Sequence, residues 1–322
     1  MPEYKVLLTD YAWADVEIER STLEDVDAEL ILAPASDEES LIKAATGVDA
    51  IMTNWAKVTS RVLAAAPNCK IVARLGIGLD NIDVKYATEH KMLVTNVPDY
   101  CLTEVAEHAL ALLLAQARKV AFYHAETKAN RYNLQAGAQL RRIAGQTLGI
   151  VGLGNIGRQL AHKAAALGLK VHAYSRSRSN PIPGVEWRTI DELLHESDYL
   201  SLHLPLNAET RHMFGAKEFA RMKPTAYLIN TARGGLIDPA ALAAALQAGQ
   251  LAGAALDVQD PEPPDLSVPP YNDPRVIVTP HAAFVSTESL ENLRERVACQ
   301  VADLLMGRRP ENVINPQVLQ SR

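Results

Sequence analysis

The stretch TLGIVGLGNIGR, residues 147–158, decides the fold of this chain. Its apolar first half is typical of a buried parallel strand and leads directly into a Gly-x-Gly-x-x-Gly turn. Gly152 permits a tight turn, Gly154 lets the backbone approach an anion, and Gly157 allows the following helix to pack closely. The free N–H groups at the N-terminus of that helix would face the same anion. The stretch therefore predicts a site for the pyrophosphate of a dinucleotide.

The residues after this turn support the prediction. Residues 158–167 have helical spacing, Gly168 suits the position after a helix C-terminus, and residues 171–174 have the pattern of a further strand. A Gly-x-Gly-x-x-Gly motif alone is weak evidence, because glycine-rich turns occur in many loops. The order strand, turn, helix, strand supplies the context that the motif requires.

Composition and charge exclude several classes of protein. At 322 residues and 48% hydrophobic content, the chain is long enough for two domains. A formal net charge of −6 without a long basic run argues against a nucleic-acid partner. The longest apolar run, residues 109–115, is too short to cross a membrane, and the N-terminus lacks the pattern of a signal peptide. We therefore expect a soluble cytoplasmic protein.

The cysteines indicate no covalent or metal framework. Cys69, Cys101 and Cys299 stand at scattered positions without CxxC or ligand spacing. We expect neither a disulfide framework nor a bound metal.

Two series of alternating strands and helices organise the chain. The first series has strand patterns at residues 5–10, 28–34, 49–54, 69–76 and 92–98, with helix patterns at 39–45, 60–66 and 83–90. The second begins at Leu148 and has later strand patterns at 199–204, 226–230, 254–258 and 276–279.

Helical segments join and follow these series. Residues 103–128 form one long helical pattern, which we interpret as a helix connecting two domains. Asp238 and Pro239 suit a helix start and Gly249 a helix end. The last helix pattern, residues 287–306, has no strands of its own, so we expect it to pack back on the first domain.

The predicted fold class is α/β, with two Rossmann-like or flavodoxin-like parallel-sheet domains and a cleft between them. We expect residues 1–98 and 285–322 to form a substrate-binding, catalytic domain. Residues 99–284 are expected to form the dinucleotide-binding domain.

Three segments of the second series place a reactive side chain just beyond a strand. They are NTARGG (230–235), DVQDPEPP (257–264) and TPHAAF (279–284), and they carry Arg233, Glu262 and His281. Residues beyond the carboxyl ends of parallel strands converge on one crevice. These three side chains are therefore candidates for a common site.

At this point the chain resembles the D-isomer-specific 2-hydroxyacid dehydrogenase family over essentially its full length. The motifs that carry the resemblance are RLGIGLDNID (74–83), NVPDYCLTEVAEH (96–108), GLGNIG (152–157), HLPLNAET (203–210), NTARGG, DVQDPEPP and PHAAF (280–284). Seven motifs in this order indicate the family far more specifically than any one of the motifs does.

The resemblance implies that His281 is the acid/base, Glu262 its orienting carboxylate and Arg233 the clamp for a substrate carboxylate. The chemistry suits each residue. Reduction of a 2-keto acid places negative charge on the carbonyl oxygen, and an imidazole is a suitable proton donor near neutral pH. A carboxylate neighbour favours the charged imidazole and fixes its tautomer. A planar guanidinium binds a carboxylate through two charge-assisted hydrogen bonds.

The resemblance also implies further contacts. Backbone amides at Ile77 and Gly78 would hold the substrate carboxylate, and Tyr100 stands where some members carry a tyrosine that contacts the substrate. Trp55 follows the strand that faces the same cleft, so we expect both aromatics to shape the pocket, unless they are ordinary core or rim aromatics. Cofactor contacts are implied at Gly152, Gly154, Asn155, Ile156, Gly157, Leu204, Pro205, Thr210, Thr231, Ala232 and Asp257.

The end of the second strand bears on which nicotinamide cofactor is used. NAD-type members of the family carry an acidic residue where this chain has Ser175, and the segment continues with Arg176, Ser177 and Arg178. A hydroxyl and two arginines suit a phosphate dianion. We therefore expect NADP(H) to be favoured over NAD(H), with the reductive direction, unless SRSRS (175–179) is only a solvated turn.

Several functions remain open. The leading hypothesis is an NAD(P)-dependent reductase of small 2-keto acids such as glyoxylate or hydroxypyruvate. A 3-phosphoglycerate dehydrogenase is a rival, although the chain ends soon after Pro316 and few cationic groups lie near Trp55. Formate-dehydrogenase-like chemistry is disfavoured because it needs no acid/base couple. A dinucleotide-sensing, corepressor-like interaction protein is the alternative from outside enzymology.

The irregular segment 130–142 resembles the arm through which family members pair. The resemblance therefore implies a homodimer, and the other interpretation of this segment is a mobile surface loop.

Overall fold

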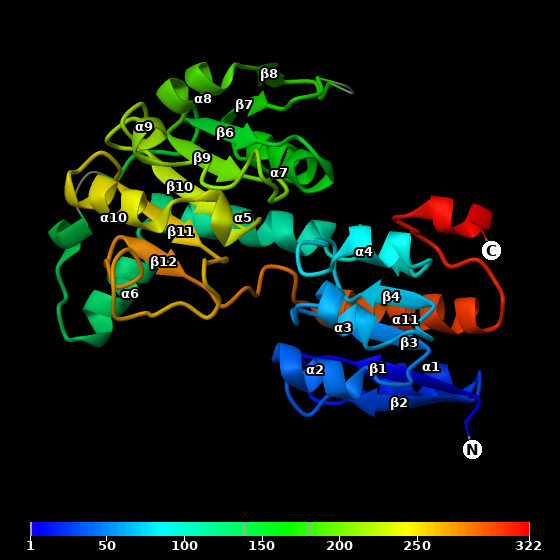
Figure 1. Ribbon diagram of the computed structural model, residues 1–322. Helices are drawn as coiled ribbons and strands as arrows, with labels where there is room; N and C mark the ends of the chain where they lie inside the picture. The colour runs from blue at the N-terminus through cyan, green and yellow to red at the C-terminus, as the bar shows by residue number, and fades with distance from the viewer. Residues whose placement is uncertain (1, 138–139, 179–180, 322) are drawn as a thin grey trace. The chain divides into compact units, whose positions relative to one another are not determined.

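The computed structural model describes residues 2–137, 140–178 and 181–321. The chain forms two compact units: Met1–Tyr100 with Ser286–Arg322 is unit 1, and Cys101–Val285 is unit 2. Both units contain a parallel sheet with helices on its two faces (Figure 1). This arrangement confirms the predicted α/β class with two parallel-sheet domains.

Unit 1 contains, in its described residues, a five-stranded parallel sheet of order β2-β1-β3-β4-β5. Its strands are β1 Tyr4–Leu8, β2 Ala28–Leu32, β3 Ala50–Thr53, β4 Ile71–Arg74 and β5 Leu93–Thr95. Its helices are α1 Glu17–Glu24, α2 Glu38–Ala44, α3 Ser60–Ala64, α4 Val84–Glu89 and α11 Thr287–Leu305, followed by the 3-10 helix η3 Pro316–Ser321. This strand order is the flavodoxin-like one, whose order reverses between β1 and β3.

Unit 2 contains, in its described residues, a seven-stranded parallel sheet of order β12-β11-β10-β9-β6-β7-β8. The strands are β6 Thr147–Val151, β7 Lys170–Tyr174, β8 Val185–Trp187, β9 Tyr199–Leu202, β10 Tyr227–Asn230, β11 Gly253–Leu256 and β12 Val276–Val278. The helices are α5 Leu102–Ala117, α6 Val120–Lys128, α7 Asn155–Ala166, α8 Ile190–Glu196, α9 Ala216–Phe219 and α10 Pro239–Gln247, with 3-10 helices η1 Leu134–Gly137 and η2 Gly234–Leu236. The order is that of a Rossmann fold, with its reversal between β6 and β9.

Side chains alternate between the two faces of each sheet, as the period of a strand requires. In β1, Val6 and Leu8 belong to the core that includes α11, whereas Leu7 belongs to the core on the opposite face. In unit 2, Leu148 and Ile150 of β6 pack on the side of α5 and α7, and Val151 packs on the other side. Both faces of both sheets are therefore buried, which explains why the strands are continuously apolar.

Most predicted elements are confirmed, including α10 with its Asp238 cap and α11, which packs on α1 and β4 of unit 1. The prediction of one helix over residues 103–128 is wrong. The helix is interrupted between α5 and α6 because Lys119 adopts a left-handed backbone conformation, with φ 51°. The backbone there cannot continue the helical hydrogen bonds, and the break carries no glycine or proline that would reveal it in the sequence.

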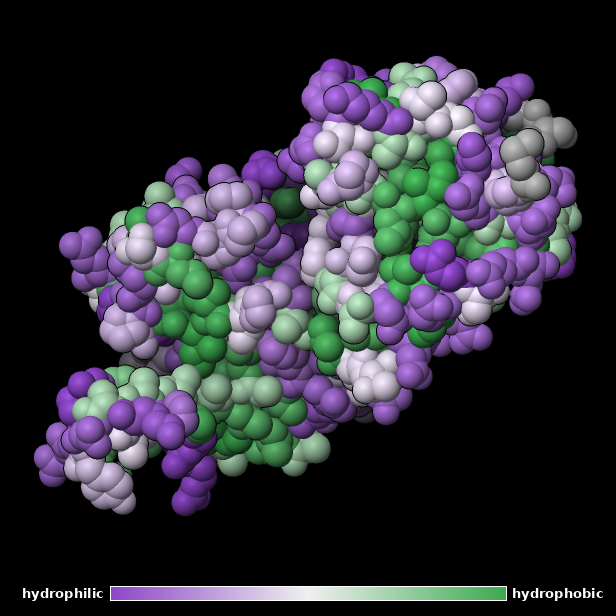
Figure 2. Space-filling model, turned by 90° about the horizontal axis from the view of Figure 1, so that it is seen from below, coloured by the Kyte–Doolittle hydropathy of each residue, from purple (hydrophilic) through white to green (hydrophobic). Residues whose placement is uncertain are grey.

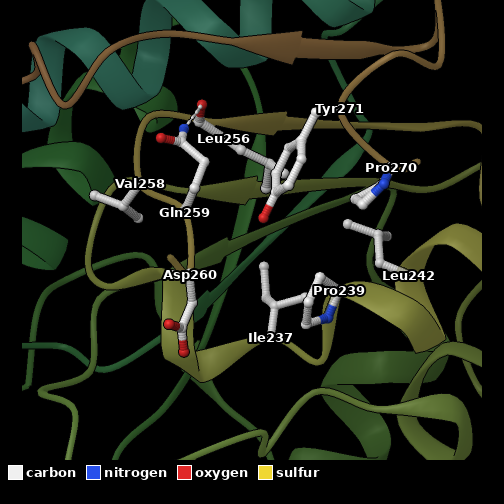
Figure 3. A pocket seen from close by; sticks show the side chains of 10 residues that line it. Ile237, Pro239, Leu242, Leu256, Val258, Gln259, Asp260, Pro270 and Tyr271 are labelled. Carbon is white, nitrogen blue, oxygen red and sulfur yellow. Dashed lines mark hydrogen bonds between the residues drawn. The ribbon is translucent and has the colours of Figure 1, made fainter. Parts of the chain in front are cut away.

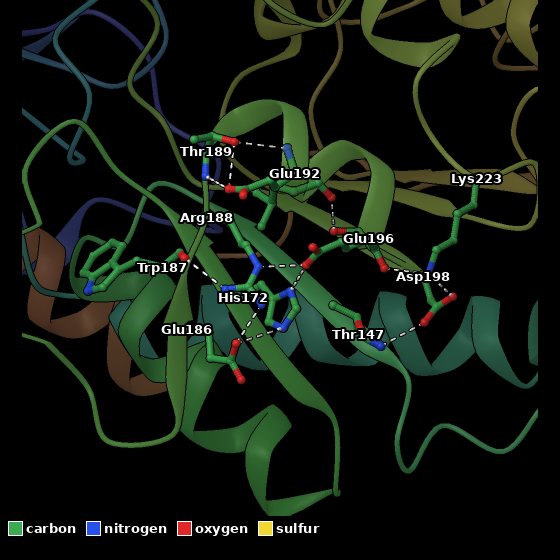
Figure 4. Close-up of polar contacts among 12 residues, drawn as sticks. Thr147, His172, Glu186, Trp187, Arg188, Thr189, Glu192, Glu196, Asp198 and Lys223 are labelled. Carbon is green, nitrogen blue, oxygen red and sulfur yellow. Dashed lines mark hydrogen bonds and ion pairs between the residues drawn. The ribbon is translucent and has the colours of Figure 1, made fainter.

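The sequence prediction also missed β8 and α8, which a polar network holds against β7 (Figure 4). Arg188 donates to the Glu196 carboxylate at 2.8 Å and to Glu186 at 2.7 Å, and the His172 ring lies 2.8 Å from Glu196. Asp198 likewise accepts from the Thr147 N–H and from Lys223, each at 2.9 Å. Ion pairs therefore help to position this edge of unit 2, together with Leu193 and Leu194 of α8, which are fully buried in the core.

Candidate active site

The glycine turn after β6 gives its three glycines different surroundings. Gly152 has φ 99°, and an added Cβ there would lie 2.5 Å from the carbonyl oxygen of His203. An added Cβ at Gly157 would lie 2.4 Å from the carbonyl oxygen of Gly152. At Gly154, the N-cap of α7, an added Cβ would meet nothing within 4 Å. Gly152 and Gly157 thus serve the turn and the packing of α7, whereas Gly154 borders open space at a helix N-terminus.

The turn Asn230–Arg233 at the end of β10 is fixed by a buried amide. Asn230 accepts from the Ala232 N–H at 3.0 Å and donates to the Arg233 carbonyl at 2.8 Å. The Arg233 guanidinium, which is half-buried, donates to the Ala232 carbonyl at 2.7 Å. In the part of the chain that the structure describes, the buried hydroxyl of Thr231 meets no hydrogen-bond partner. A buried orphan hydroxyl is expected to meet a ligand or water, which fits a bound dinucleotide.

The loops after β11 and β12 bring Glu262 and His281 together. The Nδ1 atom of His281 lies 2.9 Å from Oε2 of Glu262. The other carboxylate oxygen of Glu262 accepts from the Gln259 N–H at 2.8 Å. The His281 side chain is 23% exposed and that of Glu262 33%, so both reach solvent. The Glu262 carboxylate is therefore held by the Gln259 N–H, and the His281–Glu262 pair is accessible to a small molecule.

The backbone of His281 is itself constrained. Its φ is 52°, in the left-handed region, and its N–H donates to the carbonyls of Asp257 at 2.8 Å and Thr279 at 3.0 Å. This conformation is uncommon for a non-glycine residue, and the two hydrogen bonds hold it here. The Phe284 ring stands edge-on to the imidazole, with centroids 6.0 Å apart.

Asp257 organises this turn. Its fully buried carboxylate accepts from the Thr279 hydroxyl at 2.6 Å and from the N–H groups of Ala282 and Ala283, each at 2.9 Å, and the His108 ring lies 3.4 Å away. Burial raises the pKa of Asp257, but the hydrogen bonds from His108, Thr279 and the two amides outweigh burial and bring the pKa to about 2. Asp257 is therefore ionised and holds the segment that carries His281.

The sheet aligns these segments. Asn230, Leu256 and Val278 are register partners across β10, β11 and β12, so the three following loops leave the same edge side by side. Gly234 packs so tightly on Gln259 that an added Cβ would lie 2.0 Å from its carbonyl. The Arg233 segment thus adjoins the loop that holds Glu262, and all three residues belong to unit 2.

A small pocket lies behind this loop (Figure 3). The Tyr271 ring points into it, and its other lining residues include Gly234, Leu242, Gln259 and Asp260. Its lining does not include Arg233, Glu262 or His281, so it is distinct from the acid/base pair.

The other predicted substrate contacts belong to unit 1. The Ile77 carbonyl accepts from Asn96 at 2.8 Å, and Gly76 before it has φ 153° and abuts the Arg74 guanidinium. The turn 76–78 follows β4 directly, and Gly78 is half-buried. Trp55 has an exposed side chain, and its backbone N–H donates to the Asp10 carboxylate at 2.7 Å. Tyr100 is partly buried and packs against the unit 1 core.

Several residues that shape the site were not predicted. Gln259 donates its side-chain amide to the Leu256 and Thr279 carbonyls, each at 3.1 Å, and His108 lies 3.1 Å from the Thr279 hydroxyl. Gln259 and His108 both lie within the motifs quoted above, but nothing in the sequence indicates that α5 brings His108 to the end of β12.

Among the described residues, we find no group of His, Cys, Asp or Glu arranged to hold a metal ion. None of the helices described here is long and apolar enough to cross a membrane.

The fold and the glycine turn define a dinucleotide-binding α/β protein. The family model for the D-isomer specific 2-hydroxyacid dehydrogenase NAD binding domain matches residues 110–283. The glyoxylate reductase of Korarchaeum cryptofilum is 39% identical over 273 residues, which cover 82% of this chain and 82% of the relative. The chain therefore belongs to the D-isomer specific 2-hydroxyacid dehydrogenase family, and it is an oxidoreductase that uses a nicotinamide dinucleotide.

Two further relatives show the range of the family. The D-3-phosphoglycerate dehydrogenase of Methanocaldococcus jannaschii is 36% identical over 323 residues, covering 99% of this chain and 61% of that protein. The crystal structure of D-lactate dehydrogenase from Aquifex aeolicus, complexed with NAD and lactic acid, has a TM-score of 0.87 and 28% identity. It covers 97% of this chain and 99% of that one.

Proposed function

We propose that this protein interconverts a small 2-keto acid and its D-2-hydroxy acid, with His281 as the acid/base, Glu262 as its orienting carboxylate and Arg233 as the carboxylate clamp. The observation that carries the proposal is the 2.9 Å contact between His281 Nδ1 and Glu262 beside the aligned ends of β10, β11 and β12. An imidazole held by a carboxylate at one nitrogen is suited to exchange a proton at the other.

The chemistry of the reaction assigns a separate role to the cofactor and to each of the three residues. A bound nicotinamide supplies or accepts the hydride. His281 gives a proton from Nε2 to the keto oxygen in reduction and takes it back from the hydroxyl in oxidation. Glu262 stabilises the protonated ring and fixes its orientation. Arg233 holds the substrate carboxylate and draws electron density from the adjacent carbonyl.

The cofactor proposal names which residues would hold the dinucleotide. The pyrophosphate is assigned to Gly154, Asn155 and Ile156 at the N-terminus of α7. Leu204, Pro205, Thr210, Thr231, Ala232 and Asp257 are proposed as further cofactor contacts, and the open space at Gly154 and the orphan hydroxyl of Thr231 support this placement. The segment after β7 carries Ser175 and Arg176, which favours NADP(H) over NAD(H); Ser179 lies outside the described residues.

We further propose a cytoplasmic homodimer that pairs through segment 130–142, of which residues 138–139 lie outside the described part. Tyr132 is 94% exposed and Leu134 86%, and a second copy of the chain would bury them. On the face seen in Figure 2, hydrophobic residues gather in several patches between hydrophilic ones, so exposed apolar surface is not confined to one segment. Sedimentation of the protein and of a Tyr132→Ser, Leu134→Ser variant tests the pairing, and a monomeric parent protein would refute it.

A turnover screen tests the function. Glyoxylate, hydroxypyruvate, pyruvate and larger 2-keto acids are assayed with NADPH and NADH, with His281→Ala as the paired variant. We expect reduction of at least one acid, a loss of turnover in His281→Ala on the order of 10³-fold, and nearly unchanged cofactor binding. Retained activity in the variant would remove His281 from its role. Bound cofactor without reduction of any acid would favour a dinucleotide sensor.

A second candidate substrate is 3-phosphoglycerate, because the M. jannaschii relative matches over nearly the whole chain. Oxidation of D-3-phosphoglycerate, assayed beside the keto acids, separates the two. A higher kcat/KM with the phosphorylated substrate would favour this candidate.

A further inference from the structure

An exposed ion pair joins the two segments that follow β7 and β9. The Arg176 guanidinium, at Nη1, lies 3.1 Å from Oε2 of Glu209, and the two side chains are 83% and 76% exposed. In the sheet β7 and β9 flank β6, so these segments border the glycine turn on its two sides. The pair therefore stands at the reversal of strand order, where dinucleotides bind in such sheets.

The position of Glu209 is set by its own loop. The Glu209 N–H donates to Asn207 Oδ1 at 2.9 Å, and the Thr210 hydroxyl donates to the Pro205 carbonyl at 2.7 Å. The Thr210 N–H also donates to Asn207 Oδ1, at 3.1 Å. These bonds make the loop a compact turn that presents the Glu209 carboxylate to Arg176.

This carboxylate changes what Arg176 offers to a ligand. Arg176 uses Nη1 in the pair with Glu209, so the pair restrains the guanidinium and leaves it fewer N–H groups to offer a phosphate dianion. The carboxylate also repels the dianion, whereas it can accept a hydrogen bond from a ribose hydroxyl. Ser175 stands where NAD-type members of the family carry an acidic residue, and the carboxylate that contacts Arg176 comes from the loop after β9.

We propose that Glu209 is a specificity-determining residue that restrains Arg176 and lowers the preference of this site for a ribose 2′-phosphate over a 2′-hydroxyl. The inference rests on the proposed cofactor site, in which Arg176 faces the ribose. The inference concerns the ratio of the affinities for a 2′-phosphate ligand and a 2′-hydroxyl ligand, and not the absolute affinity for either.

Two adenosine fragments test the inference without turnover. Calorimetric titrations with 2′,5′-ADP and 5′-AMP are made on the parent protein and on Glu209→Gln, which keeps the shape of the side chain and removes its charge. We expect the ratio of affinities, 2′,5′-ADP over 5′-AMP, to rise about two- to fivefold in Glu209→Gln, the range typical of exposed charge pairs. The ratio of kcat/KM for NADPH over NADH should move in the same direction.

Matched variants separate this effect from a general change of charge. Glu39→Gln removes a carboxylate from another exposed arginine pair, in which Glu39 lies 2.7 Å from Arg61 of unit 1, and it should leave the ratio unchanged. In an Arg176→Gln background, Glu209→Gln should raise the ratio less than it does in the parent protein, because the guanidinium that Glu209 restrains is gone and only the direct repulsion of the dianion remains.

The titrations can either support or overturn the role of Glu209. An unchanged ratio in Glu209→Gln overturns the inference, as does an equal rise in the Arg176→Gln background or a failure of both fragments to bind. A parent protein that prefers NADH would refute the proposed NADP(H) preference, yet a rise of the ratio in Glu209→Gln would still support the role of Glu209.

Discussion

Nδ1 of His281 lies 2.9 Å from Oε2 of Glu262, although 19 residues separate them and His281 sits in a left-handed backbone conformation. The relationship depends on two anchors. Gln259 holds the second oxygen of Glu262 through its N–H, and Asp257 holds the turn that carries the histidine.

Removing the charge of Glu262 should impair the acid/base couple without disturbing the fold. In Glu262→Gln we expect kcat to fall on the order of 10²-fold, because the amide no longer stabilises a protonated imidazole, while dinucleotide affinity stays unchanged. Steady-state kinetics with fluorescence titration of the cofactor measures both. Asp265→Asn changes an exposed acid in the same proline-rich loop and serves as the control; an equal loss there would contradict the role of Glu262.

The Thr279 hydroxyl should be important for the stability of the His281 turn. Thr279→Val removes the donor that lies 2.6 Å from the buried Asp257 carboxylate. We expect the free energy of unfolding to fall by about 1–2 kcal/mol, as for a lost hydrogen bond to a charged group. Urea denaturation measures it, and Thr279→Ser, which keeps the hydroxyl, should recover most of the loss. A stable Thr279→Val protein with full activity would show that Asp257 does not need this donor.

The glycines of the turn should respond differently to alanine. In Gly152→Ala, φ of 99° and the nearby His203 carbonyl should cost about 2–4 kcal/mol of stability. Gly154 has φ −77° and open space, so Gly154→Ala should unfold like the parent protein. Its dinucleotide affinity should nevertheless fall by on the order of tenfold, because the methyl group occupies the approach of the pyrophosphate. Thermal unfolding and cofactor titration separate the two effects, and tight binding by Gly154→Ala would place the pyrophosphate elsewhere.

His203 should make the protein sensitive to acid. Burial lowers the pKa of His203 from 6.5 to about 4, and its ring contacts the Ser201 hydroxyl at 2.9 Å. Between these values the unfolded chain binds the proton and the folded chain does not, so stability is lost as the pH falls from 6.5 toward 4. The loss is at most about 3 kcal/mol. His203→Gln should flatten this dependence in denaturant titrations at pH 7, 6 and 5; an identical pH profile would show that His203 is not its source.

The sequence by itself determined the parallel sheets, the glycine turn and the segments that bear Arg233, Glu262 and His281. These features are local: apolar strands buried on both faces, glycines at a turn, and polar residues after strand ends are visible within a few residues. The residues that such patterns place beyond neighbouring strands are then brought to one edge by the topology.

Only the tertiary structure decided which residues distant in the sequence meet in the fold and in the site. Glu19 of α1 is buried and accepts from Arg294 of α11 at 2.8 Å across 275 residues, and α1 has too few apolar residues to be recognised alone. His108 reaches Thr279 across 171 residues, and Glu209 reaches Arg176 across 33. Such contacts depend on how helices pack on the sheet and how loops meet at its edge, and these distances are not encoded in any local pattern.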